Sequence, residues 1–392
     1  MEKTRYRYVI LILVCMCGLS ACYCQYQMAP MAQKIMDIYG ISRQQYATVF
    51  SAPMVPAILC SLPAGMIVDK IGAKRIVLIC LILAAAGLWL RIFAKGYVML
   101  YLCMLCPGFA ATFVNATNAK IFREWFPVRQ TGLAVGIFLA VSALGMTIGT
   151  GTTAMLPSLK IAFILAGILT SVTAVCWKVF MRERKDVLSM EDGVKGDTLS
   201  YLKTAVMNRD IILGSIGIMC TFGNYMVIST YLPTVLENKG MTSVSAGATA
   251  SVVSIGYLAG CILVPVFADK VGRIRPVIFV LSLIGAALSA SIYILPAGAV
   301  LTAGLFMTGI CIGGLLPLFM SFPVRISAIG AKRAGTAGGI ISTFQLLGAV
   351  IIPSYIVSPI AGGNDFMLFI LGACFSAAVC VLVFFMTKAV EL

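Results

Sequence analysis

Twelve long apolar stretches restrict the fold of this chain more than any other feature of its sequence. A helix that crosses a bilayer needs about 20 mainly apolar residues, whereas a strand of a membrane barrel is shorter and alternates in polarity. The stretches are continuous, short polar or Pro/Gly-bearing turns separate them, and 60% of all residues are hydrophobic. The sequence therefore predicts an all-α membrane protein with twelve transmembrane helices. The expected spans are 8–30, 46–68, 76–94, 97–119, 132–154, 160–181, 211–233, 246–268, 276–295, 299–321, 334–357 and 365–387.

The basic residues indicate how these spans are oriented. Lys and Arg accumulate in cytoplasmic loops because they resist translocation. With the N-terminus inside, all but six of the 29 Lys and Arg fall in inside segments. The exceptions are Lys34, Arg43, Arg91, Lys95, Lys160 and Lys239. We therefore expect a multi-pass protein of the cytoplasmic (inner or plasma) membrane with both termini in the cytoplasm. The net charge of +15 is then explained by loops that face lipid headgroups, and no nucleic-acid partner is expected.

An internal repeat with a period close to 200 residues divides the chain. The segment around Asp69, Lys70 and Gly72 recurs around Asp269, Lys270 and Gly272, and a Phe-Pro-Val-Arg motif at 126–129 recurs at 322–325. The Gly-rich helices after these motifs also match, with Gly145 answering Gly348. The repeat predicts an N-terminal six-helix bundle over 1–181, a cytoplasmic linker over 182–208 and a C-terminal six-helix bundle over 209–392. Parallel repeats of this kind are one route to alternating access.

The loop motif resembles a signature of the major facilitator superfamily, and the resemblance extends over the whole chain. The motif positions are Gly65, Asp69, Lys70, Gly72, Lys74 and Arg75, and their echo is Asp269, Lys270, Gly272 and Arg273. The resemblance implies two pseudo-symmetric six-helix bundles and a transporter, not an enzyme. In physical terms the motif reads as a conformational latch, because a carboxylate at Asp69 can meet a positive helix N-terminus in one state only. The alternative is that these cations are ordinary anchors at the membrane surface.

A weaker resemblance points to a branch within that superfamily. Trp125-Phe126-Pro127, the Gly/Ala pattern after it and the Gln25-Tyr26 pair are similar to small-anion and carboxylate carriers of the nitrate/nitrite, cyanate and oxalate:formate exchange type. Helices two and eight here lack the arginines of nitrate porters, and helix eleven has Gln345 where oxalate exchangers place a cation. The resemblance implies a small organic anion as substrate. A small neutral or zwitterionic metabolite stays open, as does a transporter-fold receptor without flux.

Polar residues inside the spans are the candidates for substrate binding, because lipid cannot satisfy them. The expected site lies near the midplane between the halves. Its candidate residues are Tyr23, Gln25, Tyr26, Asn115, Asn118, Asn224, Tyr225, Tyr257 and Gln345. The alternative for each is that it joins helices to one another.

Arg91 is the one cation that lies well inside an apparent helix, about 23 Å along the helix axis from Ile76. At that depth it can extend to the outer membrane surface, or it can point inward and attract anions. The chain has no His and no mid-span carboxylate, which favours facilitated diffusion or exchange over proton symport. No metal-ligand spacing or phosphate-binding loop is present, so neither a metal nor a cofactor is expected. The expected partners are a small-molecule substrate and the bilayer, with the protein acting as a monomer.

Overall fold

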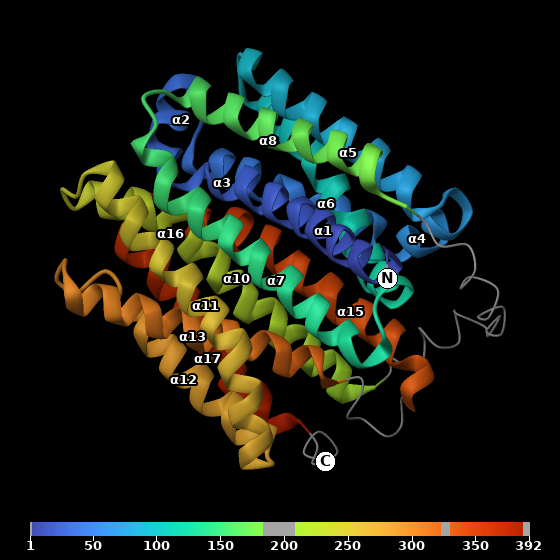
Figure 1. Cartoon of the computed structure of the whole chain (residues 1–392). Coiled ribbons are helices and arrows are strands. Elements are labelled where there is room, and N and C mark those ends of the chain that lie inside the picture. The colour runs from blue at the N-terminus through green and yellow to red at the C-terminus, as the bar shows by residue number, and fades with distance from the viewer. Residues whose placement is uncertain (1, 183–207, 323–329, 387–392) are drawn as a thin grey trace. The chain divides into compact units, whose positions relative to one another are not determined.

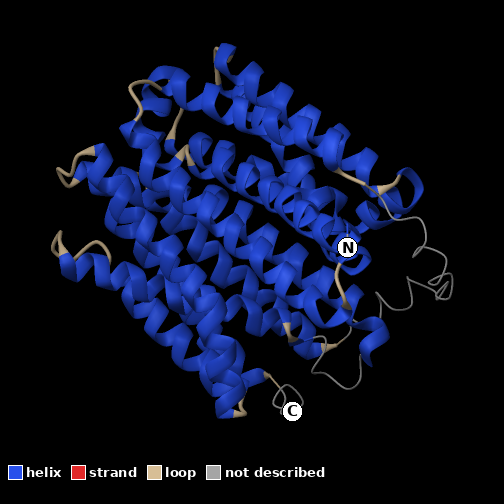
Figure 2. Ribbon diagram, in the orientation of Figure 1, coloured by secondary structure: helices blue, strands red, loops and turns tan. Residues whose placement is uncertain are grey.

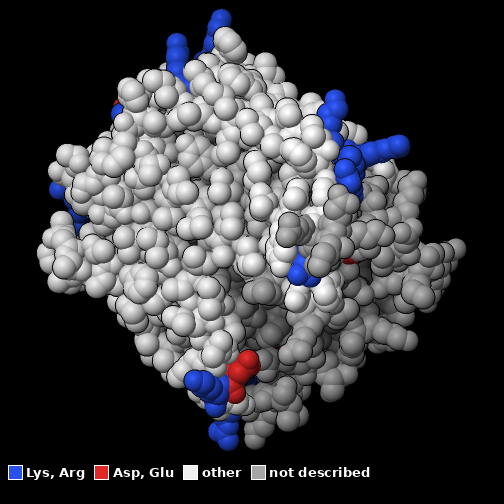
Figure 3. All heavy atoms as spheres, viewed as in Figure 1, with Lys and Arg blue, Asp and Glu red and all other residues white. Residues whose placement is uncertain are grey.

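The structure, a computed structural model, describes residues 2–182, 208–322 and 330–386. Within these ranges every regular element is a helix and no strand occurs, as Figure 2 shows. Eleven helical segments in this part of the chain are long and apolar enough to cross a membrane. Charged side chains gather at the ends of helices and leave the broad face in Figure 3 uncharged. The chain is therefore a multi-pass membrane protein, as its sequence predicts.

The chain forms two compact units, Met1–Val194 and Lys195–Leu392. The predicted linker at 182–208 falls almost entirely outside the described residues. In the first unit the elements in Figure 1 are α1 (Glu2–Tyr26), η1 (Ala29–Met31), α2 (Ala32–Tyr39), α3 (Arg43–Ser51), η2 (Ala52–Met54), α4 (Val55–Ile71), α5 (Ala73–Leu90), η3 (Arg91–Phe93), α6 (Tyr97–Trp125), α7 (Val128–Thr152), η4 (Thr153–Met155) and α8 (Leu159–Phe180). In the second unit they are α10 (Arg209–Asn238), α11 (Ser243–Val271), α12 (Ile274–Ser291), α13 (Ala299–Met320), α15 (Gly330–Ile351), η6 (Ile352–Val357), α16 (Ser358–Ala361) and α17 (Asp365–Phe385).

The second predicted span, 46–68, differs most from the structure. It is divided into α3, the 3₁₀ turn η2 and α4, and it is not among the eleven membrane-crossing segments of the described residues. A capping box begins α3, because Ser42 accepts from the amide of Gln45 and the Gln45 side chain accepts from the amide of Ser42. Pro53 and Pro56 then break the helix, because proline lacks the amide hydrogen that an α-helical turn requires.

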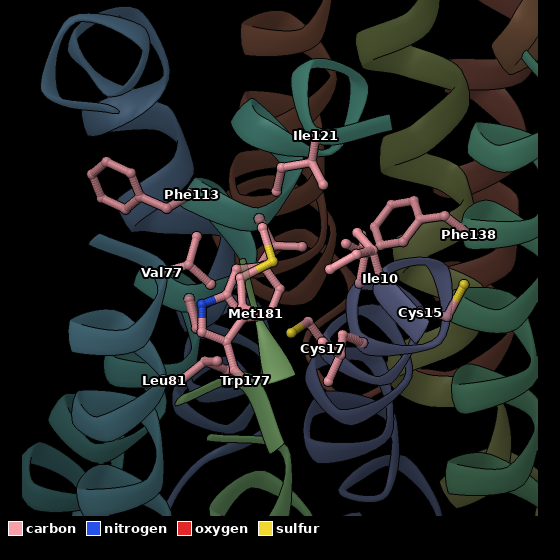
Figure 4. Packing of buried hydrophobic residues seen from close by; sticks show 14 of the residues in the cluster. Ile10, Cys15, Cys17, Val77, Leu81, Phe113, Ile121, Phe138, Trp177 and Met181 are labelled. Atoms are coloured by element: carbon pink, nitrogen blue, oxygen red, sulfur yellow. The ribbon is translucent and has the colours of Figure 1, made fainter. Parts of the chain in front are cut away.

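Apolar side chains fill the interior of the first unit. Ile10, Val77 and Trp177 are fully buried there, and Figure 4 shows side chains from α1, α5 and α8 meeting in this core. The indole nitrogen of Trp177 donates to the Lys74 carbonyl at 3.1 Å, which joins α8 to the start of α5. A second core holds the other unit around Phe319 and Phe322. Large apolar side chains also cover the outside, as a lipid-facing surface requires.

The two units repeat their closest helix crossings. A Cβ atom added at Gly108 would lie 2.2 Å from the Pro53 carbonyl oxygen, and one added at Gly309 would lie 2.3 Å from that of Val253. Both pairs are offset by about 200 residues, as the sequence repeat predicts. At these positions any side chain would force the helices apart, so glycine sets the distance between them.

The same repetition appears where α1 crosses α7 and where α10 crosses α15. A Cβ atom at Gly145 would meet the Leu19 carbonyl oxygen at 2.6 Å, and one at Gly348 would meet that of Met219 at 2.2 Å. Gly145 and Gly348 are the glycines that the sequence repeat aligns. The repeat therefore describes real equivalence of packing within each unit, and not only similar composition.

The segment from 330 to 361 contains a change of helix type. After α15 the chain makes a π-helical stretch, η6, and returns to α-helical geometry in α16. The side chain of Tyr231 on α10 donates to the carbonyl of Pro353 inside this stretch at 3.1 Å. A π-helical turn leaves backbone groups out of the α-helical pattern, and such turns occur often at functional sites. The Pro353 carbonyl also accepts from the Ser358 amide, so the Tyr231 hydroxyl is its second donor.

Candidate functional site

Arg91 has the least expected position of the charged residues. It follows α5 directly and begins η3, and its side chain is 0% exposed. Its neighbours Leu90 and Phe93 are 53% and 70% exposed, so the backbone is near the surface while the guanidinium points into the first unit. The interpretation in which Arg91 extends to the membrane surface is therefore wrong. The side chain of Arg91 instead lies buried in the interior of the first unit.

Two helices and the turn after α1 supply the contacts of this guanidinium. The ring of Phe163, from α8, lies 4.1 Å from its central carbon. Nη1 donates to the sulfur of Met104, from α6, at 3.4 Å. The amide of Gln27, which follows α1, satisfies both of its neighbours when its oxygen accepts from Arg91 Nη2 and its nitrogen donates to the Ala162 carbonyl at 2.9 Å. Each contact is neutral, and a thioether is a weak acceptor.

No carboxylate in the described part of the chain pairs with Arg91. The titratable side chains in its neighbourhood are Cys24, Tyr39, Cys103 and Tyr23, which are thiols and phenols. Arg91 Nε is buried and has no hydrogen-bond partner. Removing a charge from water costs several kcal/mol even after relaxation, and a stacked ring returns about 2 kcal/mol. The geometry thus leaves a buried cation with a donor that has no hydrogen-bond partner.

The predicted residues of the first unit divide between two places. Tyr23 is buried, and its carbonyl accepts from the amide of Gln27 at 3.0 Å, which places it one helical turn before that contact of Arg91. Gln25 instead donates to the Phe50 carbonyl at 3.0 Å, and Tyr26 packs edge-on against the Phe50 ring at 5.6 Å.

The two predicted asparagines of α6 lie away from Arg91. Asn115 is exposed and Asn118 is half-buried. Asn115 lies 11 residues beyond Met104, or about 16 Å along the helix axis. The structure therefore leaves both asparagines away from the contacts of Arg91.

In the second unit two of the predicted residues, Tyr225 and Tyr257, contact each other, whereas Asn224 faces other helices. The rings of Tyr225 and Tyr257 lie 4.8 Å apart between α10 and α11. Asn224 is fully buried and its nitrogen donates to Ser289 at 3.0 Å and to Ser376 at 2.8 Å, which ties α10 to α12 and α17. Gln345, on α15, is half-buried. Substrate binding by these residues stays a prediction, although the Asn224 nitrogen already has partners within its unit.

The loop motif is described in part. Gly65 and the side chains of Asp69 and Lys70 lie outside the description, as do residues 323–325 of the second Phe-Pro-Val-Arg motif. Gly72 has φ 91° and Gly272 has φ 68°, so each adopts the left-handed region that favours glycine where one helix ends and the next begins. The latch role of both motifs stays a prediction.

A helical stripe in the sequence could have located Arg91. Val77, Leu81, Ala84 and Leu88 of α5 are buried, and they follow one another at spacings of four, three and four residues. Three residues further along the same face is Arg91. Counting residues along the helix gave the depth of Arg91 in the membrane. The buried stripe gives the direction in which its side chain points. Within the described residues no group of three His, Cys, Asp or Glu could hold a metal ion.

Comparison with known proteins places this arrangement in context. The sequence model of the Major Facilitator Superfamily matches residues 12–353. The probable galactarate/D-glucarate transporter of Escherichia coli is 22% identical over 385 residues, which cover 85% of this chain and 84% of that protein. The probable 4-methylmuconolactone transporter of Cupriavidus pinatubonensis is 23% identical and covers 81% of this chain and 77% of its own length.

A solved structure supports the fold at the level of the whole chain. The bacterial homologue of the human lysosomal transporter Spinster, in an inward-facing and occupied conformation, aligns with a TM-score of 0.81 at 14% identity. The alignment covers 98% of this chain and 97% of that one. None of these three proteins is named for nitrate, cyanate or oxalate, so the resemblance to that branch stays a prediction.

Proposed function

Because the chain belongs to the Major Facilitator Superfamily, we propose that it is a secondary carrier of a small organic anion with a carboxylate group. Transport proceeds by alternating access between the bundles at 1–181 and 209–392, joined by the linker at 182–208. The two relatives described above are named for organic acids, which supports this substrate class. The repeated crossings at Gly145 and Gly348 support equivalent halves.

The observation that carries the substrate class is the unpaired cation at Arg91. A guanidinium presents its donors in a planar fork that matches a carboxylate, and such charge-assisted bonds are stronger than neutral ones. A neutral metabolite would leave the charge uncompensated. The chemistry around Arg91 therefore favours an anion over the neutral or zwitterionic alternative. Tyr23, a predicted polar residue of the same unit, would contact the remaining part of the substrate.

Facilitated diffusion or exchange fits the chain better than proton symport. The chain has no His, and each Asp or Glu in a described helix lies within three residues of a helix end. A proton-coupled carrier needs a titratable group along the pathway. We therefore infer that one anion is exchanged for another or moves down its own gradient.

Counterflow in proteoliposomes tests the proposal. Vesicles that contain purified protein are preloaded with a sugar dicarboxylate such as D-glucarate, and uptake of the labelled compound is followed against empty vesicles. The matched control is D-glucitol, a polyol of the same carbon skeleton without carboxylates. Saturable exchange of the acid alone supports an anion carrier. Exchange of the polyol in preference to acids would support the neutral alternative, and binding of an acid without flux would support a receptor.

A further inference from the structure

An apolar groove of about 440 Å³ lies between α11 and α12 in the second unit. Val264 and Val277 form its floor and are buried, whereas Leu263, Phe267 and Val280 form its walls and are largely exposed. Every side chain that lines the groove is apolar. Its volume is within the range of about 300–1,000 Å³ that is usual for ligand pockets. The groove lies on membrane-spanning helices, so a ligand that occupies it has to be compatible with lipid.

Two cations stand at one end of this groove. Lys270 follows Leu263 by seven residues and Phe267 by three, so it lies on the same face of α11 as the groove wall. Arg273 precedes α12 and occupies its N-cap position. Both side chains are exposed, and Figure 3 shows basic side chains gathered at the ends of α11 and α12 at the lower edge of the view.

Two other charged residues belong to this turn. Asp269 is one residue before Lys270, which turns it by about 100° around the helix, and Figure 3 shows acidic atoms beside the basic ones at this edge. Arg275 donates through Nη2 to the Val383 carbonyl on α17 at 3.1 Å. The groove therefore ends at Lys270 and Arg273, where the helices end and headgroups begin.

We propose that this groove binds one acyl chain of an anionic phospholipid, whose phosphate group is held by Lys270 and Arg273. An apolar channel with two cations at its mouth complements the two chemical parts of such a lipid. Basic residues near an anionic membrane surface each contribute to attraction, and basic pockets between membrane helices bind anionic headgroups. A zwitterionic phospholipid fits the groove equally well but gains less from the cations. Lys270 and Arg273 also belong to the second loop motif. A bound anionic lipid would therefore contact two side chains of the predicted latch.

Thermal unfolding of the purified full chain in detergent tests this inference. Phosphatidylglycerol and phosphatidylcholine with identical acyl chains are titrated separately. We expect phosphatidylglycerol to stabilise the protein at lower concentration. The double variant Lys270→Gln/Arg273→Gln should weaken its apparent affinity about 30-fold, at about fivefold per cation, and leave the response to phosphatidylcholine unchanged.

The matched control is the double variant Lys160→Gln/Lys178→Gln. It removes two exposed cations from the ends of α8 in the other unit, so the change in net charge is the same. This variant should keep the full preference for phosphatidylglycerol. If it loses the preference as completely as the first variant, attraction to general positive charge explains the effect and the site is refuted.

A third variant tests the groove itself. Val280→Trp places a larger side chain on a groove wall that is 49% exposed, where the protein can accommodate it without repacking its core. We expect it to weaken both lipids, with fewer lipid molecules retained per protein in native mass spectrometry. Retention equal to that of the parent protein would show that no acyl chain enters the groove and would overturn the proposal. An unchanged preference in Lys270→Gln/Arg273→Gln would overturn it as well.

Discussion

Each unit holds a cation over an aromatic ring beyond the end of a long helix, and the two pairs differ in their surroundings. Arg91 lies 4.1 Å from the Phe163 ring in the first unit, and Lys239 lies 4.2 Å from the Tyr293 ring in the second. Lys239 is exposed and donates to the Tyr293 carbonyl, whereas Arg91 is 0% exposed. The exposed ammonium keeps its water and needs no counter-ion. The buried guanidinium has lost its water, so the same cation–ring geometry has different consequences.

The two units also differ in the charge of the polar groups that they bury. The second unit buries a neutral amide, Asn224, whose nitrogen donates to Ser289 and Ser376 and whose oxygen has no hydrogen-bond partner. The first unit buries a charge whose contacts are a ring, a thioether and an amide oxygen. Neutral groups that bond each other hold helices together, whereas an incompletely compensated charge is suited to binding. The comparison therefore supports the proposal that the first unit recognises the anion.

The largest effect should follow from removing the buried charge. Arg91→Gln should weaken binding of D-glucarate, or of whichever acid shows counterflow, by at least about 30-fold, since truncating one partner of a buried charge pair costs about 2–5 kcal/mol. Lys239→Gln should change it less than about twofold, because exposed charges contribute little. Equilibrium binding to the purified variants measures both. Equal losses in the two variants would remove the distinction between the units.

A glycine exchange tests what the units have in common. Gly348→Ala places a Cβ atom 2.2 Å from the Met219 carbonyl oxygen and should lower the free energy of unfolding by about 3 kcal/mol, the upper part of the range for overpacking. Gly145→Ala should act in the same direction with a smaller loss. Gly338→Ala, on the same helix but with nothing within 4 Å, should stabilise by up to about 1 kcal/mol. Thermal unfolding in detergent compares them, and a neutral Gly348→Ala would contradict the described crossing.

The neutral cluster of the second unit should respond through stability. Asn224→Leu leaves the buried hydroxyls of Ser289 and Ser376 without their amide donor and should cost about 1–3 kcal/mol. Asn115→Ala, at an exposed position on α6, should stay within about 0.5 kcal/mol of the parent protein. Unfolding temperatures measure this difference. A stable Asn224→Leu variant that no longer binds substrate would instead favour the direct binding role predicted from the sequence.

The smallest effect distinguishes a binding cation from a structural one. Arg91→Met keeps an unbranched apolar stem and removes the uncompensated charge, so the ligand-free protein should become more stable by about 1 kcal/mol. Lys239→Met should leave stability unchanged within about 0.5 kcal/mol. The stabilisation that a bound acid gives to the parent protein should disappear in Arg91→Met. A large loss of stability in this variant would mean that Phe163, Met104 and Gln27 already compensate the charge.

Most of the fold could be predicted from the length of the apolar runs and from the period of the repeat. These features depend on the bilayer and on local sequence, and neither requires knowledge of tertiary contacts. The second span is the exception, because Pro53 and Pro56 divide it into shorter pieces. The helix α6 also continues to Trp125, beyond the predicted end at 119. A prediction from apolar runs stops at 119 because the last turns of this helix contain charged residues.

The candidate site was less accessible from sequence for a physical reason. Counting residues along a helix gives depth in the membrane but not the direction in which a side chain points. Asn224, Tyr257 and Gln345 were expected together because of their similar depth, yet Asn224 faces Ser289 and Ser376 on α12 and α17. Those serines come from distant parts of the chain, and a single sequence does not show that they meet. The burial of Arg91 could be predicted only from the buried stripe on α5, the helix that directly precedes it.

The π-helical stretch at Ile352–Val357 changes how positions on either side of it relate to each other. One extra residue in a turn advances the chain by about 100° around the helix axis, so a face followed along α15 does not continue along α16. Before the π-helical stretch, one face of the span contacts α10. After the stretch, a different face contacts α17. A cysteine-accessibility scan should show its periodicity slip by one position at Ile352. Any alignment that assumes an unbroken helix here would assign the wrong neighbours to every residue from Ser358 to Ala361.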